Sequence, residues 1–416
     1  MLKISKLLVI ASFLIILVQC TPQEKKAVEN ITLKTGMWRG VLDVQGNELP
    51  FNFELTNEGG AYKIYLINDQ ERLLLDVIEI NGDSAYIPMH IFDADIKAVI
   101  TENTMSGTWT KNYEEDYVVS FEAKHGDEDR FKTSDEEVKS FDGTWAVTFV
   151  HEEDNDTTQS VGVFKQNGSA VTGTFLTPTG DYRFLEGSVV GDKLHLSTFD
   201  GGHAFLFTAT FDENGGLIGN FWSGKSWYES WTATKDDNAS LPDANTLTYI
   251  KEGYDKLDFS FPGLDGEKVS PQDDRFKGKV VLLQIFGTWC PNCMDETKFL
   301  KQWYKDNKDR GVEILGLAYE AKDDFEYAKG RIEFMKEKLD VQYDFVVAGV
   351  KDKDEASKTL PMLNRVLAYP TMIYLDKKGD VRKIHTGFTG PGTGHHYEQY
   401  IKDFNQTVDE LLAEEG

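Results

Sequence analysis

The stretch VVLLQIFGTWCPNC, residues 280–293, decides the fold of the C-terminal part of the chain. Residues 280–286 are almost continuously apolar, which is typical of a central strand buried on both faces. Residues 287–289 follow as a turn, and Pro291 suits the first position of a helix, where a backbone N–H would have no partner. Apolar residues then recur at helical spacing as far as Trp303. We therefore expect a strand, a turn and a helix that begins directly after Cys290.

The two cysteines of this stretch are better explained by a catalytic role than by a structural one. A thiolate at Cys290 meets the unpaired N–H groups and the positive dipole end of the helix, which lowers the pKa of the thiol. Cys293, one turn further on, is placed to attack a mixed disulfide at Cys290. We assign Cys290 as the attacking and more exposed sulfur and Cys293 as the resolving one, joined in a redox disulfide. A zinc half-site is the alternative, but no second Cys/His pair follows, and we expect no metal.

The start of the chain predicts export. Lys3 and Lys6 precede an apolar run over residues 7–18, which is short for a membrane span and ends near Cys20. This segment resembles a bacterial lipoprotein signal, in which such a cysteine is lipidated, although Gln19 replaces the usual small residue. We expect a signal peptide over 1–19, a lipid anchor at Cys20, a polar tether over 20–32 and a periplasm-facing location in the bacterial cell envelope. An ordinary export signal with an incidental cysteine is the alternative.

The composition further narrows the classes of protein to which the chain can belong. The 416 residues suggest two or three domains, and 40% hydrophobic with 27% charged residues is ordinary for a globular protein. A net charge of −26 repels phosphate backbones, so nucleic acid is not expected as a partner. Apart from Cys20 the chain holds two cysteines, fewer than a structural disulfide framework needs.

Residues 33–240 read as an all-β region. Short segments such as 50–55, 61–66 and 193–196 alternate apolar and polar residues at period two, and turn signals separate them. The openings at Gly36 and Gly143 and several later motifs repeat after roughly a hundred residues. We predict two barrel- or sandwich-like modules, at 33–138 and 139–240. A cluster of aromatic residues near the end either stacks on a ligand or fills a core or domain interface, and we favour the latter: Trp222, Trp227, Tyr228 and Trp231.

After a polar linker near 236–246, strands alternate with helices. The fold class is therefore multidomain, with duplicated β modules followed by an α/β domain over 250–416. This last part resembles the TlpA/ResA-like branch of the thioredoxin superfamily. The resemblance is carried by DFSFP (258–262), FKGK (276–279), WCPNC (289–293) and YPT (369–371).

The resemblance implies further site residues. Pro370 corresponds to a cis-proline beside the dithiol, with a trans proline at a strand start as the alternative. Trp289, Pro291 and Tyr369 support the site. Glu296 matches an acid that could relay a proton to the resolving thiol, or could instead be a first-turn acid that favours the helix dipole.

Two departures and three local expectations accompany the resemblance. Gln284 stands where thioredoxins bury an acid, and Lys298 replaces a helix-kinking proline. We also expect an inserted helix and strand over about 323–348, a short helix over 361–366 and a glycine-rich loop over 388–394 beside the dithiol.

The sequence thus predicts a lipid-anchored thiol–disulfide oxidoreductase that works without a cofactor. Its expected partners are oxidised exported proteins, a membrane electron donor, and the membrane through the anchor. One alternative is a binding or scaffold lipoprotein whose β modules dock a partner or glycan, with the redox domain as an accessory. A peroxidase is a weaker alternative, because the Thr and Arg pattern around a peroxidatic cysteine is not evident.

Overall fold

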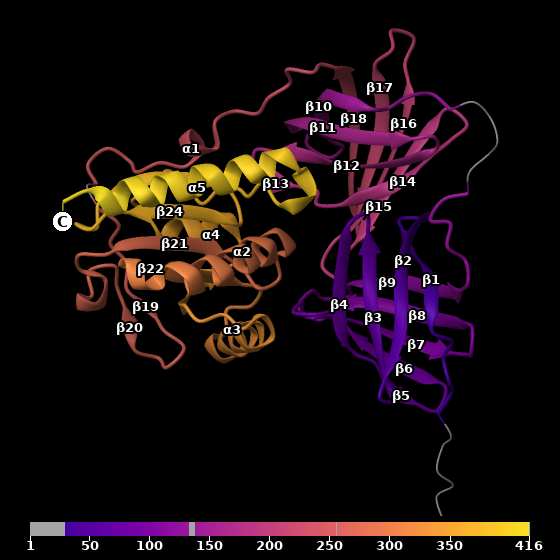
Figure 1. The fold of residues 1–416 in the computed structure, drawn as a ribbon, viewed down its shortest axis with the longest axis horizontal. Helices are drawn as coiled ribbons and strands as arrows, with labels where there is room; N and C mark the ends of the chain where they lie inside the picture. Colours follow the sequence, from indigo (N-terminus) through magenta and orange to yellow (C-terminus); the bar gives the residue numbers. More distant parts are fainter. Residues whose placement is uncertain (1–29, 133–137, 255, 416) are drawn as a thin grey trace, which may run out of the picture.

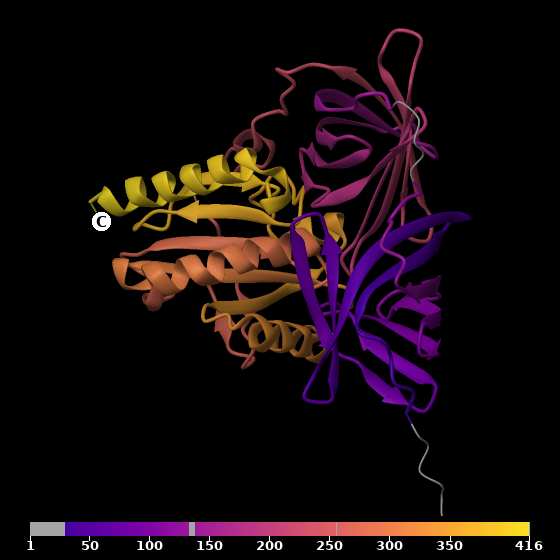
Figure 2. The ribbon, with the colours of Figure 1, turned by 45° about the vertical axis from the view of Figure 1, so that its right-hand side comes forward.

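The computed structural model describes residues 30–132, 138–254 and 256–415. The expected signal peptide, Cys20 and most of the tether lie outside these ranges. Two β modules lie one above the other, and an α/β domain packs beside both of them (Figures 1 and 2). The multidomain class, with barrel-like sheets followed by an α/β domain, is confirmed. Within the described ranges, no helix combines the length and apolar content that a membrane crossing requires.

The first module is a nine-stranded antiparallel meander in which the first long strand pairs with the last, Leu42 lying opposite Phe121. Alternation along the strands sends one side chain in two to the core, which Trp38, Phe53 and Trp109 fill. Strands β4 and β6 contact each other where the sheet curls round. The strands are β1 (Gly36–Val44), β2 (Asn47–Glu58), β3 (Ala61–Asn68), β4 (Glu71–Val77), β5 (Glu79–Asn81), β6 (Ser84–Pro88), β7 (Ala94–Ile100), β8 (Thr104–Lys111) and β9 (Val118–His125).

The second module closes into a barrel of eight strands, because β12 pairs with both β11 and β14. Its core is aromatic and includes Trp145, Phe149 and Trp231. Strand order and turn positions repeat those of the first module, as the duplicated motifs predicted. The strands are β10 (Gly143–His151), β11 (Thr157–Asn167), β12 (Ala170–Thr177), the short β13 (Gly180–Asp181), β14 (Leu185–Val190), β15 (Lys193–Phe199), β16 (Ala204–Phe211), β17 (Leu217–Ser223) and β18 (Trp227–Lys235).

The α/β domain is built on a five-stranded sheet of order β23-β22-β21-β24-β25, with β21, β22 and β23 parallel. Every residue of β21 is buried, as the apolar run predicted. Helices α2 and α5 pack on each other through Phe299 and Phe404. The elements are α1 (Ala244–Leu247), β19 (Phe261–Pro262), β20 (Lys268–Val269), β21 (Val280–Phe286), α2 (Pro291–Asn307), β22 (Val312–Glu320), α3 (Phe325–Leu339), β23 (Asp344–Val350), α4 (Lys353–Thr359), β24 (Thr371–Leu375), β25 (Val381–Thr386) and α5 (His395–Ala413), with 3-10 turns at Asp274–Phe276, Lys308–Arg310 and Pro391–Thr393.

Two expectations need correction. The short helix expected over 361–366 does not form, and α4 precedes it instead. Asp352 caps α4 by accepting hydrogen bonds from the backbone N–H groups of residues 354 and 355, and the helix stops before Pro361 because the residue preceding a proline disfavours helical backbone. Of the four clustered aromatic residues, Trp231 is buried in the barrel core and Trp222 packs against the hydrophobic cluster of the first module and the α/β domain, as expected, whereas Trp227 is exposed and stacks on His151.

Two glycines at equivalent positions of the duplicated modules provide a test of the close strand packing. A Cβ atom at Gly107 would collide with the carbonyl oxygen of Lys97, and one at Gly219 would collide with the Trp231 ring. Gly107→Ala and Gly219→Ala should each lower the free energy of unfolding by about 1–3 kcal/mol, because the strands must shift. Urea unfolding followed by tryptophan fluorescence measures this change. Exposed Ser106→Ala, on the same strand as Gly107, is the control; glycine variants as stable as that control would contradict the packing.

Candidate active site

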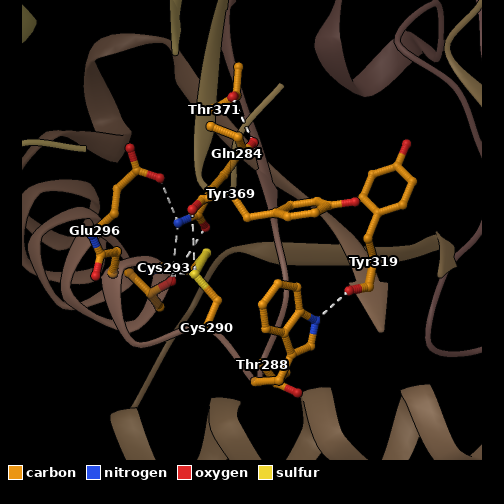
Figure 3. The surroundings of a disulfide bond; sticks show 12 residues. Gln284, Thr288, Cys290, Cys293, Glu296, Tyr319, Tyr369 and Thr371 are labelled. Carbon is orange, nitrogen blue, oxygen red and sulfur yellow. Dashed lines mark hydrogen bonds between the residues drawn. A yellow bond between two sulfur atoms is a disulfide. The ribbon is translucent and has the colours of Figure 1, made fainter. Parts of the chain in front are cut away.

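The two cysteines of residues 290–293 form a disulfide with a Cα–Cα distance of 5.2 Å (Figure 3). Cys290 is the N-cap of α2, and its Sγ accepts a hydrogen bond of 3.2 Å from the backbone N–H of Cys293. Pro291 is the first residue of the helix, as its missing N–H predicted. The turn therefore directs a backbone donor at the sulfur that was assigned as the attacking one.

The residues implied by the family resemblance lie around this sulfur. The Tyr369–Pro370 peptide bond is cis, and the Tyr369 carbonyl oxygen lies 3.6 Å from Cys290 Sγ. The indole N–H of Trp289 donates to the backbone oxygen of Tyr319 at 2.9 Å, and the Trp289 ring stands edge-on to Tyr369. The structure thus brings Trp289, Tyr369 and Pro370 together at the dithiol.

Glu296 is completely buried, in the second turn of α2 rather than at a first-turn position facing the dipole. Its carboxylate accepts hydrogen bonds from Gln284 Nε2 at 2.9 Å and from the Tyr400 hydroxyl at 3.2 Å. Burial raises the pKa of Glu296 to about 7, and the hydrogen bonds from Gln284 and Tyr400 limit the rise. The group can therefore gain or lose a proton near neutral pH.

Gln284 and Tyr400 are partners that the sequence reasoning missed. From the sequence, Gln284 was notable only because thioredoxins bury an acid at this position. In the structure its side-chain amide donates a hydrogen bond to Glu296, the buried acid of α2 that points toward β21 (Figure 3). The signal was available, because Gln284 is the sole polar residue of an otherwise apolar strand. Tyr400, more than a hundred residues away on α5, gave no such signal.

A second buried acid, Glu320 at the end of β22, fixes the turn before Cys290. Its carboxylate accepts hydrogen bonds from the backbone N–H of Thr288 at 2.9 Å and from the Thr288 hydroxyl at 2.7 Å. Burial raises the pKa of Glu320 to about 7. Strands β21 and β22 are parallel, so their C-terminal ends meet at one edge of the sheet and bring this acid to the dithiol turn.

The β modules cover the dithiol, which the sequence did not predict. Cys290 is 6% exposed and Cys293 1%, so the expected order holds but neither sulfur lies open to solvent. Asn292, between the cysteines, donates a hydrogen bond of 2.9 Å from Nδ2 to the backbone oxygen of Asp181 in the second module. Gly202 of the same module abuts Pro291.

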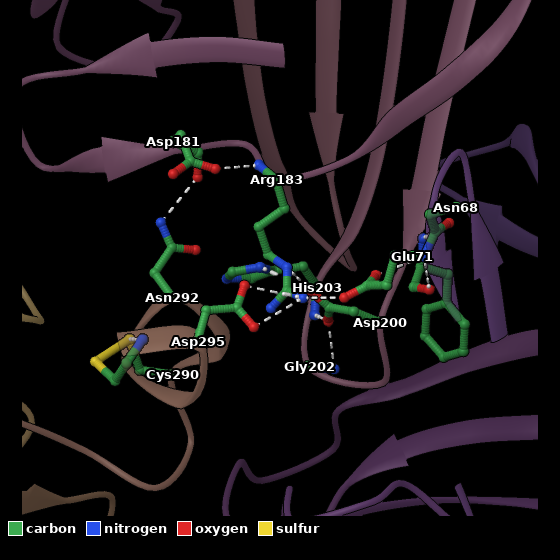
Figure 4. Close-up of polar contacts among 12 residues, drawn as sticks. Asn68, Glu71, Asp181, Arg183, Asp200, Gly202, His203, Cys290, Asn292 and Asp295 are labelled. Atoms are coloured by element: carbon green, nitrogen blue, oxygen red, sulfur yellow. Dashed lines mark hydrogen bonds and ion pairs between the residues drawn. A yellow bond between two sulfur atoms is a disulfide. The ribbon is translucent and has the colours of Figure 1, made fainter. Parts of the chain in front are cut away.

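Beside this contact, a single buried cation faces three carboxylates. Arg183 forms ion pairs with Glu71 of the first module, with Asp200 of the second at 3.3 Å, and with Asp295 of α2 at 3.2 Å (Figure 4). Burial opposes the charge of Arg183, but Asp295, Glu71 and Asp200 outweigh it and raise the pKa of the guanidinium. Lys298, whose role the sequence left open, lies 3.7 Å from Asp295.

The described residues contain no group of three or more His, Cys, Asp or Glu side chains arranged to hold a metal ion.

The buried Glu296 predicts a pH-dependent stability difference. Because the folded protein keeps this proton up to a pKa of about 7, whereas an unfolded glutamate loses it near 4.5, the free energy of unfolding falls as pH rises through this window. Glu296→Gln removes the titration. Its stability relative to wild type should rise by on the order of 2 kcal/mol between pH 5 and pH 8, measured by urea unfolding. The exposed Glu398→Gln serves as control. A Glu296→Gln difference that is constant with pH would contradict the burial of a titrating acid.

The α/β part of the chain is similar to known proteins. A Redoxin family model matches residues 242–401. The thioredoxin-like protein YneN of Bacillus subtilis (strain 168) is 30% identical over 138 residues, which cover 33% of this chain and 73% of that protein. The thiol-disulfide oxidoreductase ResA of Bacillus thuringiensis subsp. konkukian (strain 97-27) is 32% identical over 151 residues, covering 36% of this chain and 76% of the relative.

Among solved structures, a thiol:disulfide interchange protein of the thioredoxin family from Chlorobium tepidum TLS aligns with a TM-score of 0.30 and 20% identity, over 40% of this chain and all of that one. The Redoxin match leaves both β modules outside it. With the dithiol at the start of α2 and these relatives, the chain belongs to the ResA- and TlpA-like thioredoxin-superfamily proteins and is a thiol–disulfide oxidoreductase.

Proposed function

We propose that this oxidoreductase reduces disulfides of exported proteins, with Cys290 as the attacking and Cys293 as the resolving thiol. The observation that carries the proposal is the position of Cys290 Sγ at the N-cap of α2, where it accepts the N–H of Cys293. A thiolate at this position gains the same hydrogen bond and the positive end of the helix dipole. Cys293 is the more deeply buried sulfur, as suits a group that reacts second.

The reaction balances as two successive thiol–disulfide exchanges. The Cys290 thiolate attacks one sulfur of the substrate disulfide, and the other substrate sulfur leaves as a thiolate. Cys293, once deprotonated, attacks Cys290 Sγ and releases the second substrate sulfur. The substrate gains two electrons and two protons, and the enzyme is left with the Cys290–Cys293 disulfide seen here. A dithiol donor at the membrane then reduces this disulfide by the same two exchanges in reverse.

Glu296 is proposed as the acceptor of the Cys293 proton. It follows Cys293 by three residues on the same helix, so the two side chains share a face of α2. The partners of its carboxylate, Gln284 and Tyr400, are both neutral donors, and its pKa of about 7 lets it pass a proton near neutral pH.

Tyr369, Pro370 and Trp289 are proposed as supports for the substrate chain beside the dithiol. The Tyr369 carbonyl contacts Cys290 Sγ, and Trp289 packs against the Tyr369 ring. Backbone groups at this edge are available to a substrate strand only when the β modules do not cover the neighbouring turn.

The proposed location is the outer side of a bacterial membrane, through a lipid on Cys20. The support is the basic start, the apolar run over 7–18 and the cysteine that follows it, all of which lie outside the described residues. We further propose 33–138, 139–240 and 250–416 as separate folding units, since the sheets end at His125, Lys235 and Thr386.

Trapping of a mixed disulfide tests the assignment of the two thiols. Cys293→Ser should retain a protein substrate on Cys290 as a covalent adduct that dithiothreitol releases, because the resolving attack is lost. Cys290→Ser, the matched control, should retain at least about tenfold less, since the remaining thiol lacks the N-cap position. The measurement is non-reducing electrophoresis with mass spectrometry, alongside insulin reduction by the wild type. Equal trapping by both variants would refute the assignment, and no trapping together with no reduction of either insulin or a small aromatic disulfide would refute the reductase proposal.

The proposed anchor makes a separate prediction at the amino terminus. Mass spectrometry of the mature protein should find a chain that begins at Cys20 and carries a lipid. Cys20→Ser should remove the lipid and release the protein from the membrane fraction. A chain cut at another residue, or one with an unmodified Cys20, would contradict the lipoprotein proposal.

A further inference from the structure

The segment 178–183 of the second module lies directly on the dithiol turn. Asp181 is buried, and its backbone oxygen accepts the hydrogen bond from Asn292 Nδ2 at 2.9 Å. Its carboxylate accepts a second one, of 2.6 Å, from the backbone N–H of Gly390, in the loop before α5. A Cβ atom at Gly180 would lie 2.7 Å from Asn292 Nδ2, so the side chain of Asn292 packs against a backbone position that only glycine leaves free.

A second turn, residues 200–203 between β15 and β16, covers the start of α2 from another side. A Cβ atom at Gly202 would lie 2.8 Å from Pro291 Cγ and 3.5 Å from the ring of Phe92, which belongs to the first module. Three parts of the chain thus meet at Gly202. The dithiol turn is therefore packed against two segments of this same chain, 178–183 and 200–203.

This arrangement blocks the chemistry that the domain performs. Thiol–disulfide exchange requires the substrate sulfur to reach the attacking sulfur, so its rate depends on access. Two turns of a folded barrel lie against Pro291 and Asn292, and Cys290 is only 6% exposed, so a disulfide of a protein substrate is sterically hindered from reaching Sγ. A productive encounter requires the β modules to move away from α2.

Arg183 is the residue that ties the covered arrangement together. It is 2% exposed, and its three carboxylate partners come from three different folded parts: Glu71 on β4, Asp200 in the β15–β16 turn, and Asp295 on α2. Removing one member of a buried ion cluster leaves uncompensated charge. Separation of α2 from the modules would break the link to Asp295 but would leave Asp200 on the same module as Arg183.

The rest of the interface is suited to reversible separation. It contains polar contacts such as Lys351 with Glu114 at 3.1 Å and the Tyr327 hydroxyl with Asp93 at 2.8 Å. Apolar residues of the first module and of the α/β domain also belong to one hydrophobic cluster, so the interface is mixed, and interfaces of this kind between domains of one chain permit relative motion. At the dithiol, Asn292 Oδ1 and Arg183 Nη1 are buried without a hydrogen-bond partner among the described residues, and water would hydrate both in an open state.

We propose that the two β modules form a cap over the dithiol, with Arg183 as its latch, and that the cap must lift before a protein disulfide is reduced. This inference rests on the proposed function for its substrate, but not for its geometry. The α/β domain follows the second barrel through residues 236–243, which form neither helix nor strand and serve as the hinge. The cap protects the reactive sulfur from unselected partners, and it admits a substrate only after the domains separate.

A steric wedge at Gly202 tests the cap without touching the dithiol or its hydrogen bonds. Gly202→Leu places a side chain against Pro291 and forces the turn away from α2. The control is Gly330→Leu on α3, where the added side chain meets open space. Arg183→Gln, which removes the latch, is a second variant. All are made in the full chain.

The readout is the accessibility of Cys290 in the reduced protein. Each variant is alkylated with iodoacetamide or with a large polyethylene-glycol maleimide, and mass spectrometry of the Cys290 peptide gives the two rates. In wild type the large reagent should be strongly disfavoured relative to the small one. Gly202→Leu and Arg183→Gln should raise the ratio of large- to small-reagent rates at least about tenfold, because they populate the open state, whereas Gly330→Leu should leave it unchanged.

Two results would overturn the cap: a wild-type Cys290 as open to the large reagent as that of Gly202→Leu, or a Gly202→Leu ratio equal to that of Gly330→Leu. Circular dichroism shows whether Arg183→Gln is folded; if it is not, the Gly202→Leu comparison decides. Alkylation needs no turnover, so the cap and the proposed function fail separately. If every variant is inert toward both insulin and a small aromatic disulfide, the reductase proposal fails while the alkylation ratios still decide the cap.

Discussion

The guanidinium of Arg183 is surrounded by carboxylates from all three folded parts of the molecule. Burial of such a cation costs hydration free energy, and the carboxylates of Asp295, Glu71 and Asp200 offset that cost. Because these acids lie on different parts of the chain, the cluster is complete only when both β modules and α2 are docked. One side chain thus joins all three folded parts of the molecule, and it lies beside the redox-active turn (Figure 4).

Within the α/β domain, polar groups buried behind the dithiol hold its turn in place. Gln284 on β21 and Tyr400 on α5 hold the carboxyl group of Glu296, and Glu320 on β22 holds Thr288. Each contact joins the strand or helix that carries the cysteines to a neighbouring element. The turn is thus fixed from behind by hydrogen bonds, while its front is covered by the modules. Rigid support on one side and a removable cover on the other suit a nucleophile that must be both ordered and guarded.

Local features of the site could be predicted from the sequence, and contacts between distant parts could not. The apolar run over 280–286 and Pro291 specified the strand and the helix start, because both signals are confined to a few neighbouring residues. The duplicated openings at Gly36 and Gly143 likewise revealed two modules. Arg183 resembles any other charged residue in a loop, and its partners Glu71 and Asp295 each lie 112 residues away, so no periodicity marks them. The cover on Cys290 was missed for the same reason, since exposure depends on what packs from elsewhere in the chain.

Oxidoreductase activity requires Cys290 and Cys293 to form one reversible two-electron couple. The most direct test is to equilibrate the full-length protein in thiol–disulfide buffers of graded potential, quench with an alkylating agent, and count the labels on residues 290 and 293 by mass spectrometry. Both cysteines should change together in a single transition with the slope of a two-electron couple, about 30 mV per tenfold change in ratio. Independent labelling of the two cysteines, or a disulfide that neither forms nor breaks across the range, would contradict it.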